Sequence, residues 1–277
     1  AKGYQQVADR IKSLAFNDDK SGKFFWEITA DSLIYSANRI PEISDDIINI
    51  DNAMKWGYGW ELGPFEVWDA MGVQETVSRM KKENKNVPSW VDEMLSSGRE
   101  TIYELTNGKR TYYDVLSSSV KPTEDNPKVI NLSLKKSGNN LIKRDWSASL
   151  IDLGDGVLNV EFHSALQPTL NPIDSSMGEV MNDAMDLLDA GKYKALVIGH
   201  EGANFCAGAN LANMIQVIDA KDFDKINNDL KQFQDLMQRV RFSKAPVVAA
   251  PHHMALGGGF EISAPAVHRV ALGELYM

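Results

Sequence analysis

The hydrophobic pattern of this 277-residue chain changes character near Trp146. Before that point, apolar residues recur every three or four positions, as they do in helices that bury one face. One such stripe is formed by Leu33, Ile34, Ala37 and Ile40. After that point, short apolar runs alternate with longer segments of helical period. The two patterns predict an α+β chain with two domains, a helical one followed by an α/β one.

Polar and turn-forming residues separate the two patterns between residues 119 and 145. We therefore expect a helical domain over residues 1–118, a linker over 119–145 and an α/β domain over 146–277. The apolar residues of 129–134 either form a short strand in that linker or tie the two halves together. Within the helical domain, Asn107-Gly108 predicts the turn of a β-hairpin.

The α/β half divides into segments of clear type. Gly154-Asp-Gly156 lies between two apolar runs and predicts a second hairpin. By length and period, we predict strands over residues 149–153, 157–162, 195–199, 247–250 and 268–272, and helices over 175–190 and 223–240.

Composition excludes several classes of function. Acidic residues outnumber basic ones and the formal net charge is −9, which argues against a nucleic-acid binder. The single cysteine cannot form an internal disulfide, in keeping with a cytoplasmic location. We expect no membrane span, because the longest apolar run is far too short. The chain starts at Ala1 within a helix-like pattern, so we expect a cut or processed N-terminus.

Two turns of small residues carry the chemistry that we predict. The first is Phe205-Cys-Ala-Gly-Ala-Asn210 and the second is Gly257-Gly-Gly259, and each follows an apolar strand-like run. The first N–H groups of a helix have no intrahelical partner, and glycine allows a substrate carbonyl to approach them closely. Glu261 lies one helical turn beyond Gly258, where a carboxylate serves acid–base chemistry. The structural alternative is that the glycines only permit close packing and Glu261 is solvated.

Residues 195–214 and 245–272 resemble the crotonase, or enoyl-CoA hydratase/isomerase, superfamily. The resemblance covers about residues 147–277 and implies a ββα-spiral domain that acts on coenzyme A thioesters. It implies that the N–H groups of Ala209 and Gly258 form an oxyanion hole for the thioester carbonyl. Glu261 would be one of two hydratase glutamates that activate water. The residues expected along the CoA and acyl cleft are Ala207, Leu211 and Met214.

Several positions depart from the pattern of that superfamily. Asn210 replaces an aspartate, and Pro251-His-His-Met replaces a small-residue approach to the second turn. The second glutamate of the family would come after Met277. We therefore expect an incomplete crotonase domain, without the helices that close the cleft, and little hydration by this chain alone.

The first half is similar to the helical C-terminal domain of 3-hydroxyacyl-CoA dehydrogenases. The resemblance rests on residues 53–73, with Gly-Pro-Phe-Glu at their centre, and covers about residues 1–118. It implies an all-α domain from an enzyme that uses NAD. The nucleotide-binding motif of that family is not recognisable, so we expect that this chain does not bind NAD. Asn38 matches a family Asn-Arg segment near the substrate, and a purely structural role for Asn38 is the alternative.

Together, the two resemblances imply part of a fatty-acid β-oxidation enzyme. The intact protein would hydrate trans-2-enoyl-CoA and oxidise the resulting 3-hydroxyacyl-CoA with NAD, and it would form an oligomer. One alternative keeps the crotonase fold and changes the reaction to isomerisation or thioester hydrolysis. A second alternative is a non-catalytic module that binds acyl-CoA or supports assembly.

Other reactive side chains give weaker predictions. Cys206 is either a nucleophile or a small buried thiol, and the second interpretation is favoured because no histidine is placed beside it. His252 and His253 are adjacent in the chain and no third ligand is evident, so no metal site is predicted. His163 and His200 each follow a strand and are interpreted as polar loop residues.

Overall fold

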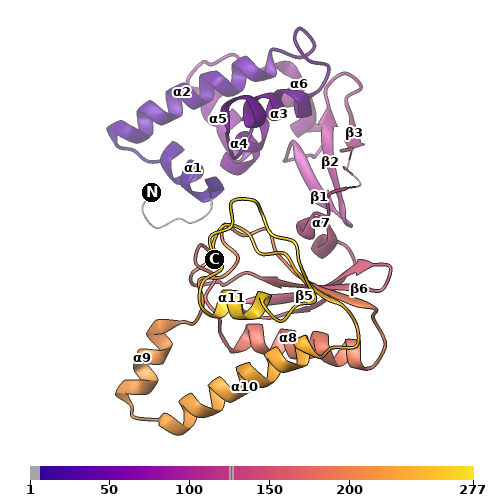
Figure 1. Cartoon of the computed structure of the whole chain (residues 1–277). Helices are drawn as coiled ribbons and strands as arrows, with labels where there is room; N and C mark the ends of the chain where they lie inside the picture. Colours follow the sequence, from indigo (N-terminus) through magenta and orange to yellow (C-terminus); the bar gives the residue numbers. More distant parts are fainter. Residues whose placement is uncertain (1–6, 125, 127) are drawn as a thin grey trace. The chain divides into compact units, whose positions relative to one another are not determined.

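The computed structural model describes residues 7–124, 126 and 128–277. The chain divides into two compact units, residues 1–126 and 127–277 (Figure 1). Each unit has its own hydrophobic core, and the two cores share no residue.

Short helices make up most of the first unit. Asp19 and Asp46 begin two of them by accepting hydrogen bonds from the N–H groups of Gly22 and Asn49. Pro64 occupies the first position of a third, where its missing N–H costs nothing. The helices are α1 (Val7–Ala15), α2 (Lys20–Ala37), α3 (Ile47–Tyr58), α4 (Pro64–Met71), α5 (Val73–Lys82) and α6 (Ser89–Ser96).

Large aromatic side chains fill the core of this unit. Trp26, Phe65 and Trp68 are almost completely buried. The indole N–H of Trp68 donates to the Thr76 hydroxyl at 2.7 Å, so its one polar group is satisfied inside the core. This pairing leaves α4 fixed against α5.

A three-stranded antiparallel sheet completes the first unit. It consists of β1 (Tyr103–Thr106), β2 (Lys109–Asp114) and β3 (Ser119–Pro122) in that order. The hairpin predicted at Asn107-Gly108 is confirmed, because both residues have positive φ and Thr106 pairs with Lys109. The expectation of an all-α domain is therefore wrong: the helices share their core with Tyr112 and Tyr113 of the sheet.

The second unit is built on a mixed six-stranded sheet in sequential order. Its strands are β4 (Leu141–Arg144), β5 (Ala148–Gly154), β6 (Val157–Phe162), β7 (Ala195–Ile198), β8 (Val247–Ala249) and β9 (His268–Arg269). The first three are antiparallel, and β6 to β9 run parallel. This arrangement confirms an α/β half with a hairpin between β5 and β6. Because parallel strands end at one edge, the loops after β7 and β8 lie together.

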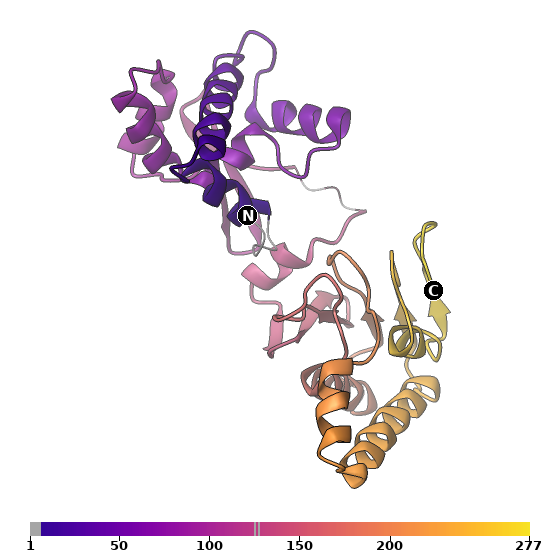
Figure 2. The ribbon, with the colours of Figure 1, turned by 90° about the vertical axis from the view of Figure 1, so that its left-hand side faces the viewer.

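Five helices accompany this sheet: α7 (Leu132–Ser137), α8 (Ser175–Asp189), α9 (Leu211–Asp219), α10 (Phe223–Arg241) and α11 (Gly258–Ser263). Helix α8 packs on β5, β6 and β7 through a fully buried stripe of methionine and aliphatic residues. Helix α10 packs beside α8 only in its C-terminal half, through Leu236 and Val240. Helix α9 buries no residue; it meets α10 at the turn between them, and the two helices diverge from there (Figure 2).

The stretch expected as a linker, residues 119–145, contains β3, α7 and β4. Its polar composition misled the prediction, because β3 and β4 pair through their backbones at edges of their sheets. The strand suggested over 129–134 is wrong: residues 129–131 form no strand, and Asn131 caps α7, which begins at Leu132. The last predicted strand is shorter than expected, since only His268 and Arg269 pair with β8.

No helix within the described ranges is both long and apolar enough to span a lipid bilayer.

Candidate functional site

The two small-residue turns lie against each other in the second unit. The N–H of Cys206 donates to the Met254 carbonyl at 3.0 Å, and the N–H of Leu256 donates to the Cys206 carbonyl at 2.9 Å. These bonds form a short parallel bridge between Cys206 and Ala255. Residues separated by about fifty positions are therefore held together by backbone groups alone.

Glycine is required where the turns meet. Gly208 has φ +97°, and a methyl group on it would lie 2.8 Å from the Leu256 carbonyl oxygen. A methyl group on Gly259 would overlap the Cys206 carbonyl oxygen. Because backbone atoms cannot retreat from these contacts as a side chain can, larger residues would push the turns apart.

Two backbone donors face this junction. A methyl group on Gly258 would lie 3.7 Å from the Ala209 nitrogen, and one on Gly208 would lie 3.2 Å from the Gly258 nitrogen. Neither the Ala209 N–H nor the Gly258 N–H donates a hydrogen bond to any part of the chain that the structure describes. Ala209 is exposed and Gly258 is half-buried, so both N–H groups are open to an external acceptor.

The other predicted site residues surround this junction unequally. Glu261 is exposed, and its carboxylate has no hydrogen-bond or ion-pair partner among the described residues. Leu211 and Met214 lie on α9 directly after Ala209 and are 68% and 36% exposed. The N–H of Ala207 donates to the Leu170 carbonyl at 2.8 Å, so it is not free for a ligand.

Asn210 replaces the aspartate of the resembled pattern without loss of its local role. Its side-chain oxygen accepts from the N–H of Asn213 and so caps α9. Asparagine and aspartate are about equally good at this position. The substitution is therefore compatible with the same turn.

The structure favours the buried-thiol interpretation of Cys206. The side chain is fully buried, and burial raises the pKa of its thiol to about 11, so the thiolate is scarce at neutral pH. No group of three or more histidine, cysteine or acidic side chains could hold a metal ion within residues 7–124, 126 and 128–277.

Two polar residues that the sequence pattern does not indicate support the first turn. Asn171 is buried and donates to the Phe162 and Phe205 carbonyls. His200, interpreted as an ordinary loop residue, contacts the same Phe205 carbonyl at 2.8 Å. Each lies in a loop without a recognisable pattern, so only the fold brings them to one carbonyl.

The first unit contains a separate apolar groove of about 940 Å³. Its walls come from α1 to α4 and include Phe25, Leu33, Ile50 and Val67. Arg39 is a cation on this lining. Its Nε is buried and has no partner among the described residues, whereas its Nη1 pairs with Glu42 at 2.7 Å. The groove thus combines an apolar wall with one free donor.

Asn38 does not line this groove. It is exposed at the C-terminal cap of α2, and its side chain donates to the Ile34 carbonyl at 2.9 Å. The contact is local and accounts for the asparagine as a helix-ending residue.

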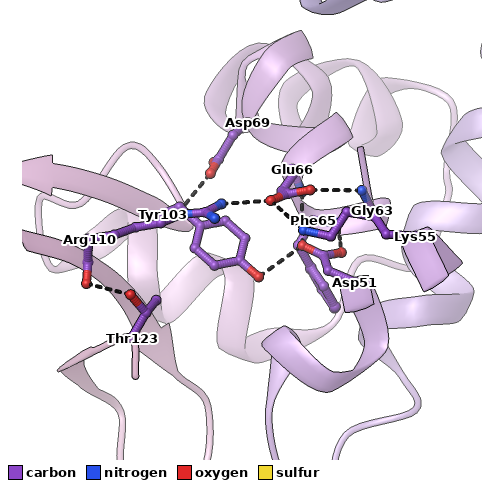
Figure 3. Close-up of polar contacts among 9 residues, drawn as sticks. All are labelled: Asp51, Lys55, Gly63, Phe65, Glu66, Asp69, Tyr103, Arg110 and Thr123. Carbon is purple, nitrogen blue, oxygen red and sulfur yellow. Dashed lines mark hydrogen bonds and ion pairs between the residues drawn. The ribbon is translucent and has the colours of Figure 1, made fainter. Parts of the chain in front are cut away.

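Buried carboxylates join α3, α4 and the sheet of the first unit (Figure 3). Asp51 accepts from the Phe65 N–H at 2.8 Å and from the Tyr103 hydroxyl at 2.9 Å. Asp69 accepts from the N–H groups of Ile102 and Tyr103 at 2.6 and 2.7 Å. These bonds fix the start of β1 to the helices.

The same carboxylates have perturbed pKa values. Burial raises the pKa of Asp51 to about 7 and that of Asp69 to about 6. Burial also acts on Glu66, but hydrogen bonds from Arg110, Gly63 and Lys55 outweigh it and hold the pKa of Glu66 below its usual value. Perturbed pKa values mark functional sites or structural networks. The backbone partners of these groups favour a structural network.

Comparison with known proteins agrees with this geometry in the second unit. Residues 166–275 match the family model described as enoyl-CoA hydratase/isomerase. This segment contains both turns, α8 to α11 and β7 to β9. The match supports a crotonase type of fold for the second unit and a relation to the enoyl-CoA hydratases of fatty-acid oxidation.

Curated proteins similar to the chain carry names from the same area of metabolism. A "Probable 3-hydroxyacyl-CoA dehydrogenase" of Bacillus subtilis is 40% identical over 277 residues, which is all of this chain and 34% of that protein. A "Putative fatty acid oxidation complex trifunctional enzyme" of Rickettsia felis is 24% identical and covers 96% of this chain and 33% of its own length. The chain thus spans about a third of these relatives.

Other matches cover less of the chain. A "Probable enoyl-CoA hydratase" of Bacillus subtilis is 30% identical over 106 residues, 38% of this chain and 40% of that protein. Among solved structures, an enoyl-CoA hydratase from Shewanella pealeana has a TM-score of 0.41 at 22% identity, covering 47% of this chain and 48% of its own. One from Thermoplasma volcanium has a TM-score of 0.40 at 24% identity, covering 47% and 50%.

Proposed function

We propose that the second unit binds acyl-CoA thioesters and hydrates trans-2-enoyl-CoA to 3-hydroxyacyl-CoA. The observation that carries this proposal is the pair of free N–H groups of Ala209 and Gly258 in two touching turns. The thioester carbonyl oxygen accepts from both donors. As water adds, this oxygen gains the charge of an enolate, which fixed backbone donors stabilise without reorganising.

Glu261 supplies the acid–base step in this proposal. Its carboxylate accepts a proton from the attacking water as the hydroxyl bonds to C3 of the enoyl group. A proton then bonds to C2, and the thioester remains intact. The exposed, unpaired position of Glu261 keeps it available for this exchange.

Two rival functions share the same donors. Isomerisation or thioester hydrolysis uses the same oxyanion site with other acid–base groups. A binding or assembly module uses it with no chemistry. In both rivals, unlike the hydratase, Glu261 is not the group that activates water.

The test compares the wild-type chain with Glu261→Gln, which keeps the size and removes the charge. A chromophoric cinnamoyl-CoA thioester reports carbonyl polarisation as an absorbance shift to longer wavelength. We expect both proteins to bind it with the same shift, since the backbone donors are unchanged. Hydration of crotonyl-CoA is expected to be slow in this chain alone, and in the variant it should fall further, by about 10²–10⁴-fold.

Other results separate the rivals. Binding with the spectral shift but with equal hydration in both proteins would remove Glu261 from the mechanism. Binding without any turnover, in wild type as well, would favour the binding module. A wild-type chain that neither binds nor shifts the probe would overturn the thioester site itself.

A second candidate function belongs to the first unit. We propose that its apolar groove holds the acyl part of a 3-hydroxyacyl-CoA during oxidation with NAD, with Arg39 Nε as a donor to a ligand oxygen. The apolar lining and the unpartnered Nε support this assignment. The dehydrogenase name of the Bacillus subtilis relative supports it as well. The test is an acyl-CoA titration of the groove variant Ala53→Arg.

A further inference from the structure

His200 connects both ends of the loop that leads into the first turn. Its Nδ1 lies 3.0 Å from the Gly202 nitrogen, and its Nε2 lies 2.8 Å from the Phe205 carbonyl oxygen. The Gly202 N–H donates, so Nδ1 carries no proton and accepts. The proton is therefore on Nε2, which donates to Phe205, and the ring is neutral.

A second side chain meets the same carbonyl. Asn171 donates to the Phe205 oxygen at 3.3 Å and to the Phe162 oxygen at 3.2 Å, while its own oxygen accepts from the Ser164 N–H. Phe205 itself is fully buried, and its ring stacks on the His200 ring with 5.6 Å between centroids. Phe205 is thus held through its carbonyl and through its ring.

The backbone connects Phe205 to the two N–H donors. Its N–H bonds to the His252 carbonyl at 3.2 Å, and the next residue, Cys206, forms the bridge to the second turn. Three residues further on, Ala209 supplies one of the free N–H groups. A displacement of the Phe205 carbonyl therefore moves the first turn against Gly258.

We propose that neutral His200 is a positioning residue for the oxyanion site, acting through Phe205 to hold the Ala209 N–H beside the Gly258 N–H. The inference rests on the proposed thioester function. It concerns a residue in a loop that the acid–base chemistry does not use, and it makes thioester polarisation depend on the protonation of His200.

The surroundings of His200 disfavour its charged form. Burial lowers the pKa of His200 to about 4. The hydrogen bond to Phe205 acts in the opposite direction, and the neighbouring His252 and His163 lower this pKa further. Burial and neighbouring His253 lower the pKa of His252. Burial also lowers the pKa of His163. Glu161 raises this pKa, whereas Lys136 and Arg144 lower it. None of the described carboxylates forms a hydrogen bond or an ion pair with the His200 ring.

Two substitutions distinguish the effect of the His200 hydrogen bonds from the effect of its ring stacking. His200→Phe keeps an aromatic ring on Phe205 and removes both hydrogen bonds. His200→Gln places an amide N–H near the Nε2 position and does not titrate. His268→Phe is the matched control, because His268 is exposed on β9. The readout is the absorbance shift and affinity of the cinnamoyl-CoA thioester, with circular dichroism to follow folding.

At neutral pH we expect His200→Phe to lose most of the spectral shift and about tenfold in affinity, and His200→Gln to retain both. His268→Phe should match wild type. As pH falls through about 4, wild type should lose the shift more than His200→Gln, because a histidine with a lowered pKa supports the fold only while it is neutral.

Several results would overturn the inference. Equal shifts in wild type and both His200 variants would show that the loop holds its position without the bond to Phe205. Loss of the shift in His200→Gln as well as His200→Phe, with both folded, would exclude donation from Nε2 as the cause. If His200→Phe does not fold, the pH dependence of His200→Gln decides. A wild-type chain without any shift would instead overturn the thioester function on which the inference rests.

Discussion

The buried carboxylate of Asp51 connects several elements of the first unit. Its carboxylate joins α3 to the start of α4 and, through Tyr103, to β1. Burial raises the pKa of Asp51 to about 7, above the usual value of an aspartate. A carboxyl that is protonated more readily in the folded state stabilises the fold below its unfolded pKa, and this stabilisation is lost as pH rises through about 7.

Asp51→Asn should flatten this pH dependence. We expect wild type to lose roughly 2 kcal/mol of unfolding free energy relative to the variant between pH 5 and pH 8. Urea unfolding followed by tryptophan fluorescence reports on the first unit, since it contains five of the six tryptophans. Asp92→Asn, at a surface ion pair with Lys81, is the control. Parallel pH curves for wild type and Asp51→Asn would contradict the prediction.

At the scale of elements, the second unit depends on how tightly two turns approach. The start of α11 and the turn before α9 meet without side chains between them, because Gly208 and Gly259 leave room only for hydrogen atoms. This close approach places the free N–H groups of Ala209 and Gly258 together. Neither turn has this property alone.

Gly259→Ala should therefore separate the turns. The added methyl group would overlap the Cys206 carbonyl oxygen, so we expect a loss of about 1–3 kcal/mol in unfolding free energy and loss of the cinnamoyl-CoA shift. Gly273→Ala is the matched control, since a methyl group there meets no atom within 4 Å. It should change stability by less than about 0.5 kcal/mol. A Gly259→Ala protein as stable as Gly273→Ala would show that the turns can yield.

At the scale of the whole molecule, the chain carries two separate candidate sites for one class of ligand. The apolar groove belongs to the first unit, and the pair of N–H donors belongs to the second. The two cores share no residue. Substitution in one site should therefore leave the fold around the other site intact.

Calorimetric titration with a long-chain acyl-CoA should then show two binding events in the wild-type chain. Ala53→Arg should remove one of them, because an exposed arginine on the groove wall occupies the apolar space. Asn52→Arg adds the same charge at the neighbouring position, which does not line the groove, and should keep both. The cinnamoyl-CoA shift should be the same in all three proteins. A single binding event that Ala53→Arg leaves unchanged would exclude the groove as a ligand site.

The sequence by itself determined most helices and strands, and it showed the change of hydrophobic pattern near Trp146. Apolar period located α8 and α10, and Asn107-Gly108 and Gly154-Asp-Gly156 located two hairpins. These features arise from local backbone preference and from burial of one face, which neighbouring residues decide. The small residues marked the two turns, and the resemblance to the crotonase superfamily implied Ala209 and Gly258 as the candidate donors.

Only the tertiary structure decided what those local features do together. Strands β3 and β4 come from polar sequence and exist because a neighbouring strand offers backbone partners. Asn171 and His200 lie 29 positions apart, and only the fold brings both to the Phe205 carbonyl. Burial in the folded chain raises the pKa of Asp51, although the hydrogen bonds from Phe65 and Tyr103 oppose this shift. A local sequence pattern does not predict hydrogen bonds between distant segments or the burial that their packing causes, because both depend on the path of the whole chain.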